Sequence, residues 1–271
     1  MTMTTTLKIL FTNAFCILVI PNPTRTFLYS SAIDFNTWLL YFQYAACFGV
    51  ELTMNNYTAT YFVDHFGLTT ESASAIASIF GFMNIFARGL GGFTSDKFMN
   101  KYGMRGRIIW QATTLIMEGI CIFLFASVDA LWAAILLLTI FSIFVQAAEG
   151  STYGIVPYVN TAAPGAVSGI VGAGGPTGAV VFGFFFRQIS NVKTAYYFMA
   201  GLVVLSGLSC LLICIKGHCG LLYGTDDGER PALELPEAED LEVDEVVHKV
   251  GEEDDASGSK VGSSDVDEVD A

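Results

Sequence analysis

Apolar runs of about 20 residues, separated by short polar segments, fill most of the chain between residues 37 and 215. A helix of that length is long enough to cross the hydrocarbon core of a bilayer. We predict six spans, at about 37–57, 73–94, 108–127, 131–156, 166–187 and 195–215. The segments between them are too short to hold a soluble domain. The pattern therefore predicts an all-α membrane protein whose bundle occupies residues 36–216.

A seventh apolar run, residues 7–20, is shorter and is followed by Pro21 and Pro23. A run of this length is more typical of a signal-peptide core or of a re-entrant or interfacial segment than of a span. No clear small-residue cleavage pattern accompanies it. We expect residues 1–35 to form an apolar segment and a linker outside the bundle.

Composition agrees with several spans and shows where the charge lies. Apolar residues make up 53% of the chain, and the mean hydropathy is +0.54. Of the net charge of −13, the part from Thr225 onward contributes −15 and the remainder +2. A segment that is so acidic and so poor in aromatic residues cannot bury enough apolar surface to fold. Residues 217–271 are therefore predicted to be disordered. Such a tail is either a solvated terminus or a regulatory docking segment.

Basic residues predict the orientation in the membrane. The segment after the second span carries Lys97, Lys101, Arg105 and Arg107. Because short cytosolic loops are enriched in Lys and Arg, this segment is placed in the cytosol. Counting spans then places the acidic tail in the cytosol too, although Arg187 and Lys193 fall on the outer side.

Arg88 is the only charged residue between Ala73 and Phe93. An ionisable residue inside a span is costly and is by default a functional-site hypothesis. Its counter-charge is either an anion that binds and leaves or a buried carboxylate, for which Glu149 and Glu118 are the candidates. A planar guanidinium offers paired donors that match a planar oxyanion, and it keeps its charge.

Two further motifs lie in the predicted bundle. The fifth span carries six glycines within SGIVGAGGPTGAVVFG, at positions 169, 172, 174, 175, 178 and 183. Glycine is unfavourable inside a helix, so this density indicates close helix packing or backbone exposed to a ligand. The second motif follows the second span and contains Gly92, Asp96, Lys97, Arg105 and Arg107. It resembles the G-x-x-x-D-K/R-x-G-R-R loop of the major facilitator superfamily, which braces and gates conformational change.

The glycine-rich span resembles the nitrate signature of the nitrate/nitrite porter family, a branch of that superfamily. The stretch from Asn84 to Gly92 resembles the family's A-R-x-x-G-G span, and Tyr44 with Phe48-Gly49 matches its Tyr…Phe-Gly pattern. The resemblance covers about residues 31–216. It corresponds to the second half of a twelve-span porter of the algal and plant type, here a six-transmembrane-helix half-bundle.

The resemblance implies roles for individual residues. Arg88 would be one of two arginines that grip the anion, Tyr44 would hydrogen-bond the anion, and Phe48 would lie against its flat face. Gly172, Gly174 and Gly175 would let the fifth span approach the site and slide. Asn84, one helical turn from Arg88, is expected to orient it. At about 1.5 Å per residue, these positions fall in one slab somewhat below mid-membrane.

The function predicted is proton-coupled transport of nitrate or nitrite by alternating access. Glu51, Glu118 and Glu149 are the acids within spans, and Glu118 or Glu149 is the candidate for proton coupling or for an ion pair. The implied partners are the anion, protons, a missing first half or second chain, and a single-span accessory protein, with no nucleic acid. The expected location is the plasma membrane.

Other functions stay open at this point. The chain could be a truncated or regulatory half-porter without transport of its own, or a facilitator of another small anion. We expect it to be a fragment of a longer porter. Its six cysteines and three histidines show no zinc-type spacing, and neither a catalytic triad nor a phosphate loop is present in the sequence. An enzyme is therefore not expected, and neither a metal nor a cofactor is implied.

Overall fold

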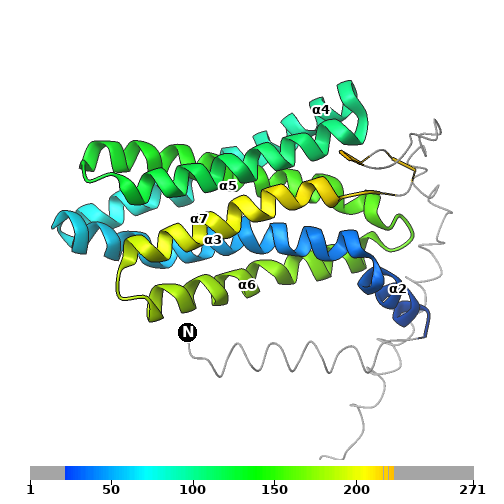
Figure 1. Cartoon of the computed structure of the whole chain (residues 1–271), viewed down its shortest axis with the longest axis horizontal. Helices are drawn as coiled ribbons and strands as arrows, with labels where there is room; N and C mark the ends of the chain where they lie inside the picture. The colour runs from blue at the N-terminus through cyan, green and yellow to red at the C-terminus, as the bar shows by residue number, and fades with distance from the viewer. Residues whose placement is uncertain (1–21, 216, 219, 223–271) are drawn as a thin grey trace, which may run out of the picture. The chain divides into compact units, whose positions relative to one another are not determined.

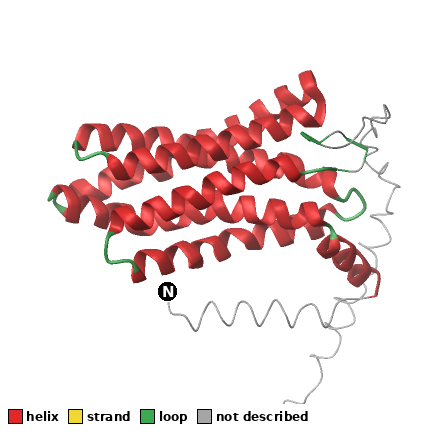
Figure 2. Cartoon of the chain, in the orientation of Figure 1, coloured by secondary structure: helices red, strands yellow, loops and turns green. Residues whose placement is uncertain are grey.

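The computed structural model describes residues 22–215, 217–218 and 220–222. The predicted apolar segment at residues 7–20 and most of the predicted acidic tail lie outside these residues. Within the described part, helices are joined by short loops and no strand occurs (Figure 2).

Six α-helices and one short 3₁₀ turn make up the described chain. They are α2 (Asn22–Ile33), α3 (Phe35–Phe66), α4 (Thr70–Ser127), α5 (Leu131–Val159), α6 (Pro164–Gln188) and α7 (Val192–Ser209), followed by the turn Cys210–Leu212. Helix α3 packs against α4, α5, α6 and α7, and α4 packs along α5 and α7. These long helices run lengthwise beside one another, and α2 lies at one end of α3 (Figure 1).

Helix α4 holds two of the predicted spans, separated by a break at Gly103. There φ is 66° and ψ is −157°, a backbone conformation that glycine adopts without steric cost. The chain reverses at this point, so α4 consists of two limbs, residues 70–102 and 104–127. The prediction of a loop between about 95 and 107 was wrong, since this segment is helical on both sides of Gly103. The charged residues Asp96, Lys97, Lys101 and Arg105 of this segment are exposed and interrupt its apolar positions, so no apolar run marked the helix.

Local sequence signals set several helix ends. The Asp34 carboxylate accepts from the Asn36 amide at 2.9 Å and caps the start of α3. Gly67 ends α3 in the left-handed conformation, with φ of 65°, and its N–H donates to the Val63 carbonyl at 3.0 Å. The linker predicted within residues 1–35 contains helix α2, whose few apolar residues do not form a long run.

Four of the described helices are long and apolar enough to cross a membrane by length and composition: α4, α5, α6, and α7 with its 3₁₀ extension to Leu212. Helix α3 is longer than α5, α6 or α7, but it carries polar residues in its middle, including Glu51, Asn55 and Asn56. The described part of the chain is an all-α membrane protein.

The buried apolar side chains form two clusters, which meet at a polar layer. The first contains Met54, Phe62, Phe80, Phe125, Phe141 and Tyr196, among others. The second contains Leu40, Tyr44, Cys47, Ile108, Leu115 and Ile155, among others. Along α3 and α5 the change from one cluster to the other occurs near Glu51, Gln146 and Glu149. Polar groups at this depth need partners, since unsatisfied polar groups are costly in an apolar interior.

Candidate functional site

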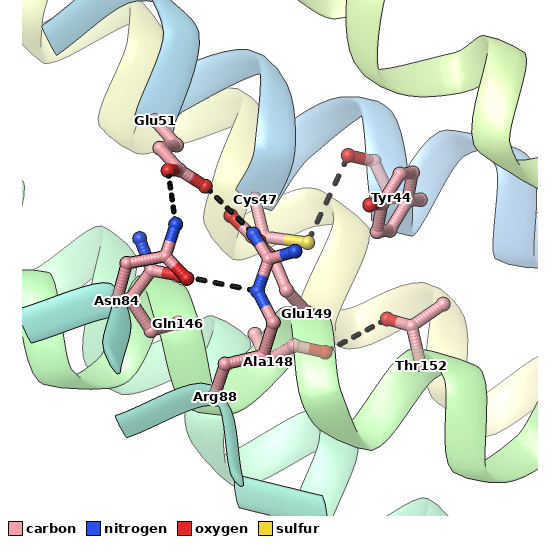
Figure 3. Close-up of polar contacts among 9 residues, drawn as sticks. All are labelled: Tyr44, Cys47, Glu51, Asn84, Arg88, Gln146, Ala148, Glu149 and Thr152. Atoms are coloured by element: carbon pink, nitrogen blue, oxygen red, sulfur yellow. Dashed lines mark hydrogen bonds and ion pairs between the residues drawn. The ribbon is translucent and has the colours of Figure 1, made fainter. Parts of the chain in front are cut away.

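Arg88, on α4, is held by polar side chains from two helices, α3 and α5 (Figure 3). Its Nη2 donates to Glu51 Oε2 on α3 at 2.9 Å and also to Glu149 Oε2 on α5. Its Nε donates to Gln146 Oε1 on α5 at 3.4 Å. In this state the counter-charge of Arg88 is therefore a pair of carboxylates. Of the two acids considered from the sequence, Glu149 is a partner of Arg88, whereas Glu118 makes no ion pair with it.

Arg88 is the accessible member of this cluster. Its side chain is 37% exposed, whereas those of Glu51 and Glu149 are 6% and 1% exposed. A small ion that approached the cluster from outside would therefore meet the guanidinium before it met either carboxylate. The arrangement places a positive charge at the surface of the cluster and its neutralising groups behind it.

Asn84 acts on Arg88 through Glu51 rather than directly. Its Nδ2 donates to Glu51 Oε1 at 2.8 Å, while Glu51 Oε2 accepts from Arg88. Both oxygens of Glu51 are thus satisfied, and this carboxylate is fixed in position. The sequence led us to expect Asn84 to orient Arg88, and the structure provides an indirect route for that role.

Three other buried carboxyl oxygens, on Glu149 and Glu118, lack a partner among the described residues. Glu149 Oε1 has no hydrogen bond among the described residues, although Oε2 binds Arg88. Glu118, on the second limb of α4, is fully buried and neither of its oxygens has a described partner. An ionised carboxylate without partners is very costly in such surroundings, so Glu118 is held as a neutral acid.

Aromatic rings line one side of Arg88. The Arg88 guanidinium carbon lies 5.7 Å from the centre of the Phe48 ring, within range of a cation–π interaction. Tyr44 stacks on Phe48 at 5.2 Å between ring centres, and Tyr153 of α5 meets Tyr44 edge-on at 5.1 Å. The structure thus brings Tyr44 and Phe48, predicted from the sequence, into one group with Arg88.

The predicted glycines of α6 lie against this aromatic group and the backbone of α3. A side chain at Gly175 would collide with the Phe48 ring, and one at Gly174 would collide with the Tyr41 carbonyl oxygen. At Gly172 an added Cβ would lie 3.1 Å from the Tyr153 hydroxyl. Close helix packing accounts for Gly174 and Gly175, one of the two explanations that the sequence left open.

Some residues that hold Arg88 in place were not predicted from the sequence to do so. Glu51 was noted only as an acid in a span, although it follows Tyr44 and Phe48 at the i, i+4, i+7 spacing of one helix face. Gly150 of α5 packs against the Arg88 carbonyl. Its pairing with Gly154 four residues later is a small-xxx-small pattern, the signal that marks a close helix crossing.

The motif after the second span ties both limbs of α4 to α5. Arg107 is buried and donates to the Asp96 carboxylate and to the Gly154 carbonyl oxygen, and its guanidinium carbon lies 5.3 Å from the Tyr158 ring centre. Arg105 Nε donates to the Gly220 carbonyl at 3.0 Å, so the described start of the predicted tail contacts the bundle.

The other two members of this motif, Lys97 and Gly92, make contacts close to their own positions. The Lys97 ammonium lies 4.5 Å from the Phe93 ring centre, and an added Cβ at Gly92 would be 3.7 Å from the Gly150 carbonyl oxygen. Both residues lie on the first limb of α4. Gly92 therefore lies beside the close crossing of α4 and α5, whereas Lys97 lies on the exposed surface.

We predict that replacing Arg107 costs more stability than replacing its ion-pair partner. Asp96 is 64% exposed, so Asp96→Asn leaves an amide that water can solvate and should change the unfolding free energy little. Arg107→Ala removes the bond to Gly154 and should cost about 1.5–3 kcal/mol, the range for hydrogen bonds to charged groups. Thermal unfolding of the detergent-solubilised chain measures both. Equal losses in the two variants would contradict this prediction, and exposed Lys101→Ala is the control.

A cavity of about 490 Å³ lies apart from Arg88 and contains none of the predicted site residues. It is lined by Tyr57, Thr60, Tyr61, Asp64, His65, Phe186, Asn191, Val192, Lys193 and Tyr196. Nearby, Lys193 donates to Asp129 at 2.6 Å and this lowers the pKa of the Asp129 carboxyl. The cavity thus lies near the loops that the basic-residue rule places on the outer side.

Comparison with known proteins identifies the family. No protein-family profile matches the chain. It is 41% identical over 160 residues to high affinity nitrate transporter 2.7 of Arabidopsis thaliana, which covers 59% of the chain and 32% of that relative. It is 45% identical over 151 residues to nitrate transporter 2.2 of Chlamydomonas reinhardtii, covering 55% and 29%. It is 36% identical over 198 residues to high-affinity nitrate transporter 2.3 of Oryza sativa, covering 72% and 38%. The chain belongs to the nitrate/nitrite porter family of the major facilitator superfamily.

This membership agrees with the resemblance found in the sequence. The chain spans about a third of the length of these porters, with shares of 32%, 29% and 38%. The relatives are transporters rather than enzymes, as was expected for this chain. The polar cluster around Arg88 therefore lies in a chain that is related to part of these porters.

Proposed function

We propose that this chain forms part of a nitrate transporter, with nitrite as a second substrate, and that Arg88 binds the transported anion. The observation that carries the proposal is the 37% exposed guanidinium of Arg88 inside a helix bundle related to nitrate transporters. A charge inside an apolar span is costly, and the partial exposure of the Arg88 side chain supports a role in binding.

The chemistry of the neighbouring groups supports a planar oxyanion. A guanidinium can donate two parallel hydrogen bonds to such an anion. The Phe48 ring, 5.7 Å from the guanidinium carbon, offers a flat apolar surface on which a planar ion can lie. Tyr44, stacked on Phe48, supplies a hydroxyl in the same aromatic group. Gly172, Gly174 and Gly175 keep α6 close to these rings and let it slide.

The wider architecture is part of the proposal. We propose that α3, the two limbs of α4, α5, α6 and α7 form a six-span half-bundle of residues 36–216, which rocks against another half during transport. The other half would come from more of the same polypeptide or from a second chain, and a single-span accessory protein is a further partner. The bundle would lie in the plasma membrane with residues 217–271 in the cytosol.

Uptake of isotope-labelled nitrate tests the proposal directly. Cells without nitrate transport of their own would express this chain alone, the first half of a plant or algal relative alone, or both together. We expect saturable uptake when both parts are present, since alternating access needs two facing halves.

The remaining outcomes separate the alternatives. Uptake by the chain alone would indicate that copies of the chain supply both halves. No nitrate uptake under any condition, with the protein present in the membrane, would reject the proposal in favour of a regulatory half-porter. Competition by unlabelled nitrite, chloride or phosphate would measure the selectivity, and equal competition by all three would favour a general anion facilitator.

A further inference from the structure

The charges around Arg88 do not balance if every group is ionised. One guanidinium faces Glu51 and Glu149, and Glu118 lies within electrostatic range of Glu149. Glu118 has no hydrogen-bond partner among the described residues and is neutral by the argument above. Two ionised carboxylates on one arginine would still leave a net charge of −1 in a buried site, which is strongly unfavourable in an apolar interior.

The geometry shows where a compensating proton can be held. Glu51 and Glu149 contact the same nitrogen, Nη2 of Arg88, so their carboxyl groups lie close to each other. Two carboxyl groups this close share a proton, because both cannot ionise together at low cost. Glu149 Oε1 is the buried oxygen without a described partner. Glu51, with donors on both oxygens, is the member whose charge is better stabilised.

We infer that anion binding at Arg88 takes up one proton at the Glu51–Glu149 pair, which is the coupling element of the transporter. This inference rests on the proposed function. Before binding, Arg88 carries one positive charge and the pair carries one proton and one negative charge. When the anion and one further proton arrive, the anion pairs with Arg88 and both carboxyls are neutral. The only covalent bond formed is one O–H bond, and the net charge is zero before and after.

The surroundings of the pair restrict which groups can take part. On α3 the neighbouring titratable groups are Cys47 and Tyr44, and on α4 they are Arg88 and Glu118. On α5, Tyr153 contacts Tyr44. Helix α6, which packs on α3, has Arg187 as its only charged residue, close to its end at Gln188. Helix α7 has Lys193 as its only charged residue, and that residue pairs with Asp129.

The anion and the two carboxylates compete for the same guanidinium of Arg88. The two carboxylates that bind Arg88 are buried, whereas the Arg88 side chain is 37% exposed. An anion that takes both Nη nitrogens displaces Glu51 and Glu149 from Nη2. Displaced carboxylates that stayed ionised would repel the anion within a few ångströms, whereas protonated carboxyls would not. Protonation of the pair therefore favours anion binding, and by reciprocity anion binding favours protonation.

Titration calorimetry of nitrate into the purified chain, together with the first half of a relative, tests this linkage. Measuring the heat in two buffers of different ionisation enthalpy gives the number of protons taken up per anion. We expect about one proton in the wild type and about none in Glu51→Gln/Glu149→Gln, because the amides keep the shape but cannot titrate. Glu118→Gln is the matched control, a buried acid without an ion pair, and should keep an uptake of about one.

The outcomes distinguish this inference from the proposed function. Nitrate binding by the wild type without proton uptake overturns the linkage and leaves the transporter proposal in place. Loss of proton uptake in Glu118→Gln overturns the assignment to the pair. Absence of nitrate binding in the wild type overturns both proposals. Even if the double variant does not fold, the wild-type measurement decides the linkage, and Glu118→Gln tests the assignment to the pair.

Discussion

Arg88→Lys should reduce nitrate uptake about 10- to 100-fold, the effect of losing one charge-assisted hydrogen bond worth about 1.5–3 kcal/mol. The guanidinium donates from Nη2 to Glu51 and Glu149 and from Nε to Gln146. Bonds from these two nitrogens fix the orientation of its plane. A lysine ammonium is a point charge that cannot present paired donors in one plane. It also cannot reach α3 and α5 with the same fork geometry.

Isotope-labelled uptake in the two-part system measures this effect, and surface labelling shows whether the variant reaches the membrane. Arg187→Lys is the matched control. It makes the same chemical change away from the site, because Arg187 is exposed at the end of α6. We expect the control to transport at the wild-type rate. Wild-type uptake by Arg88→Lys would remove Arg88 from the anion site and leave its pairing with the carboxylates as a structural contact.

The apolar runs predicted much of the helical framework. Helix α5 begins at Leu131, as predicted, and α6 extends beyond its predicted ends at 166 and 187 by only a few residues. The segment before Gly103 and helix α2 were missed for the same reason. In both segments polar residues interrupt the apolar ones, so neither contains a long hydrophobic run.

The candidate site was only partly predictable. Arg88 stood out because a single charge in an apolar span is rare, and that argument needs no tertiary structure. Its partners depend on how α3 and α5 are rotated about their axes. Glu149 was considered from its depth, but the partnership with Glu51 is visible only once α3 is placed against α4. The glycines of α6 could be read as packing or ligand contact, and the choice again needed the neighbouring helix.

Gly150→Ala should destabilise the chain and displace Arg88. A Cβ on Gly150 would collide with the Arg88 carbonyl oxygen and would lie 3.1 Å from the backbone nitrogen of Gly92. Both obstacles are backbone, so no side chain can rotate away and α4 must move from α5. Overpacking of this kind costs about 1–3 kcal/mol. The movement also lengthens the contacts from Arg88 to Gln146 and Glu149, so nitrate uptake should fall together with stability.

Replacing Gly201 by alanine should not lower the stability of the chain. Gly201 is exposed on α7, and an added Cβ there meets nothing within 4 Å. Alanine is favoured over glycine inside a helix by up to about 1 kcal/mol, so Gly201→Ala should be neutral or stabilising. Thermal unfolding of the two variants in the same detergent compares the effect on stability of one added methyl group at each position. If Gly150→Ala unfolded at the wild-type temperature and transported normally, the close crossing of α4 and α5 would not be what holds Arg88 against its carboxylates.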